Sequence, residues 1–333
     1  MNRNQAINLL LENINSLRCW RDYNCGQDVV KFRDSDEPLP PYIPQIGEKY
    51  FDDGNRPRIL MYAMNQNLNS APKEVSKYSD LKDQGMFIEI LNRLNPKATK
   101  GVKSVQDMGP YPHFNLLAAI LISIAADKTG ISLEETFERT ACTNLIKCST
   151  ATTASTPNPQ MYKNCIQTTC LDEIRILAPD IILAMSDDVF NNLTAALEFQ
   201  PVANIGKYSV YQPGHDNAEF PRIILSVYHS TGRVAGLFKK MQRYFEEGGN
   251  RPKRFRPFIK MLTGADYNGS PEYWEKARAE YFNYKELLKS SYPNFFDLKE
   301  WYGKNDEYLF YFACHYGSFK NALSETEFLS GIR

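Results

Sequence analysis

Four short runs that are rich in apolar residues constrain the fold of this chain more than any other feature of its sequence. The runs span residues 58–64, 142–147, 180–185 and 223–228. Apolar runs of this length, without alternation, are typical of strands buried on both faces, as in a parallel sheet. Apolar residues at helical spacing lie between and after the runs, over residues 86–94, 114–126, 160–178, 187–197 and 234–245. This alternation predicts an α/β fold with three layers, α/β/α, around a central, mostly parallel four-stranded sheet.

The regions on either side of this predicted core differ from it in composition. A helical period over residues 4–18 precedes a proline-rich stretch, so residues 1–40 are expected to form an N-terminal helix and an extended arm. The α/β core is expected over residues 41–247. Residues 251–333 are rich in Tyr, Phe, Lys and Glu and show helix-like spacing, which predicts a helical C-terminal extension.

Composition narrows the classes of function. The 333 residues include 39 basic and 39 acidic side chains, so binding to nucleic acid would depend on local basic patches. The longest apolar stretch is about half as long as a membrane-spanning helix requires, and the N-terminus lacks the pattern of a signal peptide. We therefore expect a cytoplasmic protein without membrane association.

The seven cysteines have no regular framework spacing, which indicates free thiols or metal ligands.

Polar residues that could bind a ligand lie in or directly after three of the four runs. Asn65 directly follows the first run, Asn144 lies in the second, and His229 directly follows the fourth. Because the carboxyl ends of parallel strands meet at one edge of the sheet, these residues are expected to line one neutral, hydrogen-bonding pocket. No Gly-x-Gly-x-x-Gly follows the first run, so no nucleotide cofactor is expected.

The order and identity of these segments resemble the uracil-DNA glycosylase superfamily over roughly residues 40–245. The Met-Asn segment at Asn65 is similar to the water-positioning motif of the single-strand-selective and mismatch-specific branches. Thr-Asn-Leu-Ile-Lys-Cys at residues 143–148 is similar to the Thr-Asn-Val-Val-Lys-Cys segment of the iron–sulfur, thermophile-type branch. His229 falls on the His of the superfamily's His-Pro-Ser signature.

The resemblance implies a monofunctional DNA glycosylase that flips a base out of the DNA. Asn65 would orient the water that attacks the sugar C1′, and His229 would stabilise the departing base as an oxyanion hole does. Asn144 would bind the polar edge of the flipped pyrimidine. No Lys stands at the attacking position, so no Schiff-base lyase step is expected. Without the resemblance, Asn65 is a turn residue that satisfies its own backbone, and His229 is a core histidine.

The resemblance also implies an aromatic side chain that stacks on the flipped base. Tyr78 and Phe87 are the candidates, and Gln66 is expected to line the same pocket. His113 is expected to be structural rather than catalytic.

Several residues are candidates for contacts with the DNA backbone. Thr231 falls on the signature Ser and, with Ser230 and Arg233, would grip a phosphate at a helix N-terminus. Lys239 and Arg254 belong to a basic and aromatic region that would follow the DNA backbone. The alternative interpretation of that region is a solvated linker.

Four cysteines are candidate ligands of a 4Fe-4S cluster. Cys148 and Cys165 stand around a Thr-Pro-x-Pro segment in the relation found in the iron–sulfur branch, which implies a cluster. Cys19 and Cys25 are the candidates for the other two ligands, although five residues separate them where the family has a Cys-x-x-Cys pair. Isolated buried thiols remain the open alternative. The other cysteines are expected in the core: Cys142, Cys170 and Cys314.

The departures from the family motifs bear on the substrate. Ala63 replaces Gly, Gln66 and Asn67 replace Pro-Gly, and Ser230 replaces Pro. Amides in place of a group that crowds the pyrimidine C5 position indicate a roomier pocket. The expected substrate is uracil or a C5-modified, even glucosylated, pyrimidine of phage DNA, so the role is base excision in DNA repair or antiviral defence.

We expect DNA as the partner, abasic-site processing enzymes downstream, and a monomer. The alternative is a catalytically silent protein of the same fold that binds DNA or a protein partner. The altered residues Ala63 and Gln66 favour this alternative, whereas the intact Asn65, Asn144 and His229 argue against it.

Overall fold

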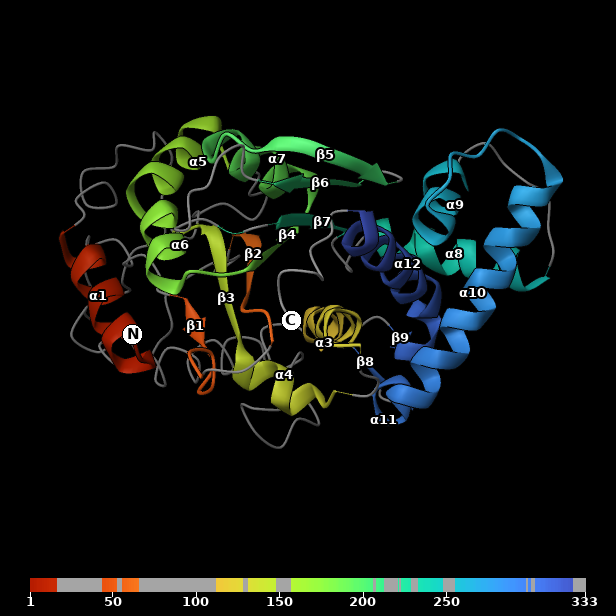
Figure 1. The fold of residues 1–333 in the computed structure, drawn as a ribbon, viewed down its shortest axis with the longest axis horizontal. Helices are drawn as coiled ribbons and strands as arrows, with labels where there is room; N and C mark the ends of the chain where they lie inside the picture. The colour runs from red at the N-terminus through yellow and green to blue at the C-terminus, as the bar shows by residue number, and fades with distance from the viewer. Residues whose placement is uncertain are drawn as a thin grey trace.

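A computed structural model shows how the predicted elements are arranged. It describes residues 1–16, 44–52, 56–65, 112–127, 131–147, 157–205, 208–212, 221, 223–228, 233–247, 255–297, 299–300 and 303–325. Within these ranges, helices cover both faces of a central sheet (Figure 1). The predicted three-layer α/β/α architecture and the helical character of the C-terminal region are confirmed.

The sheet has seven strands in the described ranges, in the order β1-β3-β2-β4-β7-β6-β5. The four parallel strands at its centre are the four that the apolar runs predict. They are β3 (Thr140–Ile146), β2 (Ile59–Asn65), β4 (Ile181–Met185) and β7 (Ile223–Val227).

Three further strands, joined through antiparallel pairings, make the sheet wider than predicted. They are β1 (Gln45–Ile46), β5 (Gln200–Ile205) and β6 (Tyr208–Gln212). β1 has only two residues, and polar residues interrupt both β5 and β6. None of the three therefore forms the continuous apolar run by which the central strands were predicted.

The central strands direct alternate side chains into two separate cores. In β2, Ile59, Met61 and Ala63 belong to the first core, whereas Leu60 and Tyr62 belong to the second. β4 follows the same alternation. Because both faces are buried, both sets of side chains must be apolar, which explains the continuous apolar runs.

The helices between the strands cover these two faces. The first face is covered by α3 (Pro112–Ala125) and α8 (Arg233–Glu247). The second face is covered by α1 (Arg3–Ser16), α5 (Pro159–Cys165), α6 (Leu171–Leu177) and α7 (Asp187–Ala196). A π-helical turn, η3 (Ile166–Cys170), joins α5 to α6, so the predicted helix over residues 160–178 is one helical segment with an irregular centre. α4 (Leu133–Arg139), which Ser132 caps, leads into β3.

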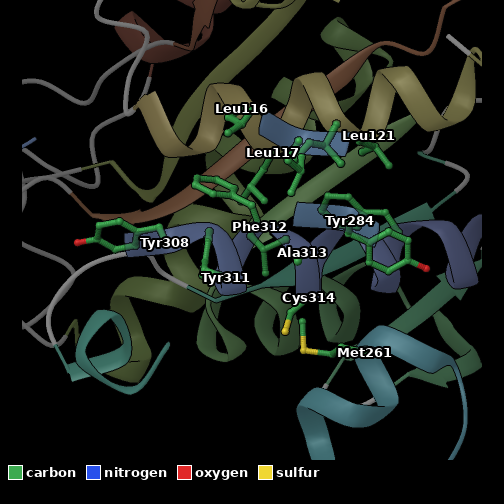
Figure 2. Close-up of a cluster of buried hydrophobic side chains, with 14 of the residues drawn as sticks. Leu116, Leu117, Leu121, Met261, Tyr284, Tyr308, Tyr311, Phe312, Ala313 and Cys314 are labelled. Atoms are coloured by element: carbon green, nitrogen blue, oxygen red, sulfur yellow. The ribbon is translucent and has the colours of Figure 1, made fainter. Parts of the chain in front are cut away.

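The C-terminal helices pack on the first face of the sheet and share its core. They are α9 (Arg256–Thr263), α10 (Pro271–Ser291), α11 (Pro293–Asp297) and α12 (Leu309–Glu325), with the 3-10 turn η5 (Asn305–Tyr308) and a small hairpin of β8 (Lys299–Glu300) and β9 (Gly303–Lys304). α12 lies between α3 and α9 (Figure 1). In Figure 2, Leu117 of α3 lies beside Phe312 of α12, while Cys314 of α12 lies toward Met261 of α9.

Two features of these helices follow from their close packing. Residues 113–122 of α3 are all buried, as expected for a helix that is apolar on every side and lies between a sheet and another helix. α12 approaches α9 closely at Gly317, where a Cβ atom would lie 2.6 Å from the carbonyl oxygen of Met261.

No helix in the described part of the chain is long and apolar enough to cross a membrane.

Candidate functional site at the carboxyl edge of the sheet

The four parallel strands deliver their carboxyl ends to one edge of the sheet. Chain order reverses at β2, because β3 lies on one side of it and β4 on the other. In open α/β sheets, ligands bind outside the carboxyl ends of the strands at such a switch point. Asn65, the last residue of β2, lies at this position.

The pairing of β2 with β3 brings two of the predicted residues onto adjacent strands. Asn144 of β3 pairs with Ala63 of β2, and Asn65 pairs with Ile146. Asn144 is 9% exposed and alternates with Thr143, which faces the second core, so it lies on the first face of the sheet. A buried amide at this depth requires partners for both its donor and its acceptor, which is the property a base-reading residue needs.

β7 ends at the same edge, two strands away from β2. Tyr62 of β2, Ala184 of β4 and Ser226 of β7 form one row across the sheet. Asn65 comes three residues after Tyr62, and His229 comes three residues after Ser226. His229 itself lies outside the described residues.

An ion pair that the sequence did not indicate lies behind the end of β3. Lys147 Nζ is 2.6 Å from Oε2 of Glu173 and donates to Oγ1 of Thr143 at 2.7 Å. The Tyr62 hydroxyl donates to the same Glu173 oxygen at 3.0 Å. Because Lys147 and Glu173 are each 1% exposed, this network ties β3 and β2 to α6 without solvent. Lys147 and Asn144 belong to one sequence motif, but their side chains lie on opposite faces of the sheet.

Burial determines the protonation states of this network. It raises the pKa of the Glu173 carboxyl, an effect that the Lys147 ammonium opposes. Burial, with the nearby Glu173 carboxylate, also raises the pKa of Tyr62 well above its usual value. Burial likewise raises the pKa of the Cys170 thiol, which donates to the Leu145 carbonyl at 3.5 Å. Tyr62 and Cys170 therefore stay protonated at neutral pH and contribute hydrogen bonds rather than acid–base chemistry.

Of the predicted cluster ligands, only Cys165 belongs to the described part of the chain. It is buried at the end of α5, where the helix passes into the π-helical turn, and it interacts electrostatically with Cys170. Such turns occur frequently at functional sites, and a buried thiol beside one fits the role of a cluster ligand. Cys19, Cys25 and Cys148 lie outside the described residues, so the cluster stays a prediction. The predicted core positions of the other three cysteines are confirmed, because each is buried: Cys142, Cys170 and Cys314.

The structure places two of the predicted DNA contacts on α8. Arg233 is the first residue of this helix, so it stands where the chain leaves the carboxyl edge after β7. The Lys239 ammonium is 2.5 Å from Glu307 and lies 5.0 Å from the ring centre of Tyr308. Lys239 thus already has an anionic partner inside the protein, and its contact with DNA stays a prediction.

The remaining predicted site residues lie outside the described ranges. They are Gln66, Tyr78, Phe87, Ser230, Thr231 and Arg254. Their assignments to base stacking, base binding and phosphate contact stay predictions.

His113 has the structural position that the sequence predicts for it. Its Nε2 lies 3.1 Å from Oδ1 of Asn305, whose own amide donates to the Phe295 carbonyl. Its ring packs against Tyr308 and Phe312, and the side chain is buried. His113 thus joins the start of α3 to the C-terminal helices.

Neither a scan of protein-family models nor a search of curated protein sequences finds a match to this chain.

Proposed function

We propose that this protein is a monofunctional DNA glycosylase that flips a pyrimidine base and hydrolyses its N-glycosidic bond to leave an abasic site. The observation that carries the proposal is the pairing of β2 with β3, which places Asn65 and Asn144 on adjacent strands at the carboxyl edge. The end of β7, two residues before His229 in the sequence, supports it, because β7 reaches the same edge.

The proposed roles follow from the charge that develops during the reaction. As the glycosidic bond breaks, the sugar becomes cation-like and the leaving base gains negative charge. Asn65 orients the attacking water without adding charge, and His229 donates a hydrogen bond to the departing base. Asn144 offers a donor and an acceptor together, which a uracil or cytosine edge requires.

The burial of Asn144 supports a selective role for it. An amide that is 9% exposed cannot turn to water when a wrong base enters the pocket. An incorrect base therefore leaves a buried donor or acceptor without a partner, which costs binding energy. Rigid parallel strands hold such a group in place more accurately than a loop would.

The proposed substrate is uracil or a pyrimidine that carries a C5 substituent. In the sequence, Gln66 and Asn67 take the places of the Pro-Gly of the family motif, and amides there instead of a group that crowds the C5 position favour a larger base. Modified pyrimidines of this kind occur in phage DNA, so defence against phage is the role that accompanies the modified substrate. DNA repair accompanies plain uracil.

Base release from defined DNA substrates tests this function. Oligonucleotides with uracil, thymine mismatches, hypoxanthine or 5-hydroxymethylcytosine, and glucosylated phage DNA, are incubated with the protein, and abasic sites are detected by alkaline cleavage. We expect release of at least one pyrimidine, loss of turnover in Asn65→Ala, and retained turnover in the control Asn192→Ala, whose half-buried side chain bonds only within α7 in the described structure. DNA binding without any base release would instead identify a catalytically silent binding protein.

A further inference from the structure

Two side chains of α12 hold the backbone of the residue that precedes His229. The Tyr311 hydroxyl donates to the Tyr228 carbonyl at 2.6 Å, and the Tyr228 N–H donates to Nε2 of His315 at 3.2 Å. The carbonyl and the N–H of Tyr228 are thus both bound from the same helix. Tyr228 in turn is the last residue before His229 in the sequence.

The hydrogen bonds fix the tautomer of His315. Its Nδ1 is 2.7 Å from the Tyr311 carbonyl, which can only accept, so Nδ1 must carry the proton. Nε2 is then the acceptor that the Tyr228 N–H requires. His315 is fully buried, and this burial lowers its pKa to about 4, so the accepting tautomer persists at neutral pH.

Tyr311 and His315 bind the backbone of Tyr228 at the point where the neighbouring strand no longer provides hydrogen-bond partners. The β4–β7 ladder ends at the pair of Met185 and Val227, and Tyr228 is the next residue. Buried backbone groups without partners are costly, so a strand end at this depth needs other donors and acceptors. Tyr311 and His315 supply them, and their rings are packed together with centres 4.3 Å apart.

The surrounding packing leaves these side chains little freedom. Phe238 of α8 packs against Tyr228, Tyr311 and His315 at once, with ring centres 5.1–6.3 Å away. Phe319, one turn after His315, also packs against the His315 ring, with ring centres 6.0 Å apart. The end of β7 is therefore fixed to a rigid aromatic cluster rather than to a mobile loop.

We propose that Tyr311 and His315 are positioning residues for His229. By fixing both backbone groups of Tyr228, they set the point and direction in which the chain leaves β7 toward His229. The helices after residue 255 thereby support the proposed active site, a role that the sequence did not indicate for them. This inference rests on the catalytic role proposed above for His229.

Variants that remove single hydrogen bonds test the proposal. Tyr311→Phe keeps the ring and loses only the bond to Tyr228, and His315→Leu loses the acceptor for the Tyr228 N–H. We expect each to lower kcat by about 10- to 100-fold with little change in KM, because small displacements of a catalytic group reduce rate strongly. His315→Gln, whose amide oxygen can accept the same N–H, should recover part of the rate.

Tyr281→Phe is the matched control. It removes a buried tyrosine hydroxyl from the same helical region, but this hydroxyl donates to Glu246, away from β7. We expect its kcat to match the wild type although its stability falls. An equal loss of kcat in Tyr281→Phe and Tyr311→Phe would overturn the proposal, because a general loss of stability would then explain both.

A second measurement does not depend on turnover. The chain has four histidines, so the imidazole ¹⁵N resonances of His229 can be assigned by substitution and compared among the full-length variants. We expect Tyr311→Phe and His315→Leu to shift them and to speed amide exchange at Tyr228, and Tyr281→Phe to do neither. If the wild type releases no base, the proposed function fails, and these resonances still decide whether α12 positions His229. Unchanged resonances in all three variants would refute the positioning role.

Discussion

Lys147 and Glu173 form an ion pair inside the core, with Nζ and Oε2 2.6 Å apart and both side chains 1% exposed. The pair connects the end of β3 to α6 on the face of the sheet opposite Asn144. Because neither group has access to water, each depends on the other for neutralisation of its charge. The ion pair therefore fixes the end of β3, the strand that carries Asn144, from the opposite face of the sheet.

Removal of one partner of this pair should destabilise the protein strongly. We expect Lys147→Met to lower the free energy of unfolding by about 3–5 kcal/mol, because an uncompensated carboxylate is left buried. Addition of Glu173→Gln to this variant should restore part of the loss, since the Tyr62 hydroxyl can still donate to the amide oxygen. Urea unfolding followed by circular dichroism measures both changes.

A surface pair provides the control. Arg175 and Asp172 form a solvent-exposed pair on α6, so Arg175→Met should change stability far less than Lys147→Met. Equal unfolding midpoints for the two variants would show that the buried pair contributes no more than a surface one.

The sequence predicted the centre of the sheet because burial on both faces leaves a local signal. The runs that contain Ile59, Ile181 and Ile223 are continuous, and each is a parallel strand in the structure. The edge strands left no such signal, because β1 has two residues and β5 contains Gln, Pro and Asn.

The sequence could not predict the contacts that support the site. Asn144 was predicted from a six-residue motif, but the partner of Lys147 lies 26 residues away in an ordinary helix. Tyr311 and His315 lie 83 and 87 residues after Tyr228, and nothing local distinguishes them from other aromatic core residues. The one available signal was Lys147 itself. A lysine at the end of a predicted buried strand requires an anionic partner elsewhere in the fold.

The buried His315 should make stability depend on pH. Its pKa is about 4 in the folded protein and about 6.5 in the unfolded chain, so both states are neutral above pH 6.5. Between these values the unfolded chain binds a proton that the folded protein does not, so stability falls as the pH falls. We expect this group to remove as much as about 3 kcal/mol by pH 4.

A comparison with His315→Gln isolates this contribution. Other groups titrate equally in both proteins, so the wild type should lose more stability than the variant between pH 6.5 and 4. Unfolding curves in urea at several pH values give the difference. Parallel pH profiles for the two proteins would mean that His315 does not stay neutral in the fold.

The predicted 4Fe-4S cluster can be tested at Cys165. If the cluster forms, protein purified without oxygen should be brown, contain iron, and lose both properties in Cys165→Ser. Cys170→Ser is the matched control, because Cys170 is equally buried near Cys165 but bonds to the Leu145 carbonyl. Iron-free, colourless wild type under these conditions would favour isolated thiols.

Gly317 should be essential to the packing of α12 on α9. A Cβ atom there would lie 2.6 Å from the Met261 carbonyl oxygen and 2.9 Å from the Leu262 Cα, and both are backbone atoms that cannot turn aside. We therefore expect Gly317→Ala to cost about 1–3 kcal/mol despite the better helix propensity of Ala. Gly236→Ala, where no atom lies within 4 Å of the new Cβ, should be neutral or stabilising in the same thermal unfolding assay.

Asn144 offers the most direct test of base recognition. Asn144→Asp keeps the shape of the side chain but replaces its donor with an acceptor, so it should repel one edge of the pyrimidine. We expect kcat/KM for the preferred base to fall by about 10- to 100-fold, the effect of leaving one buried polar group unpaired. The control is Asn115→Ala, which removes a buried amide bonded to the Leu133 carbonyl at the start of α4. It should lose stability but keep its specificity among bases, so a similar change of specificity in both variants would argue against base reading by Asn144.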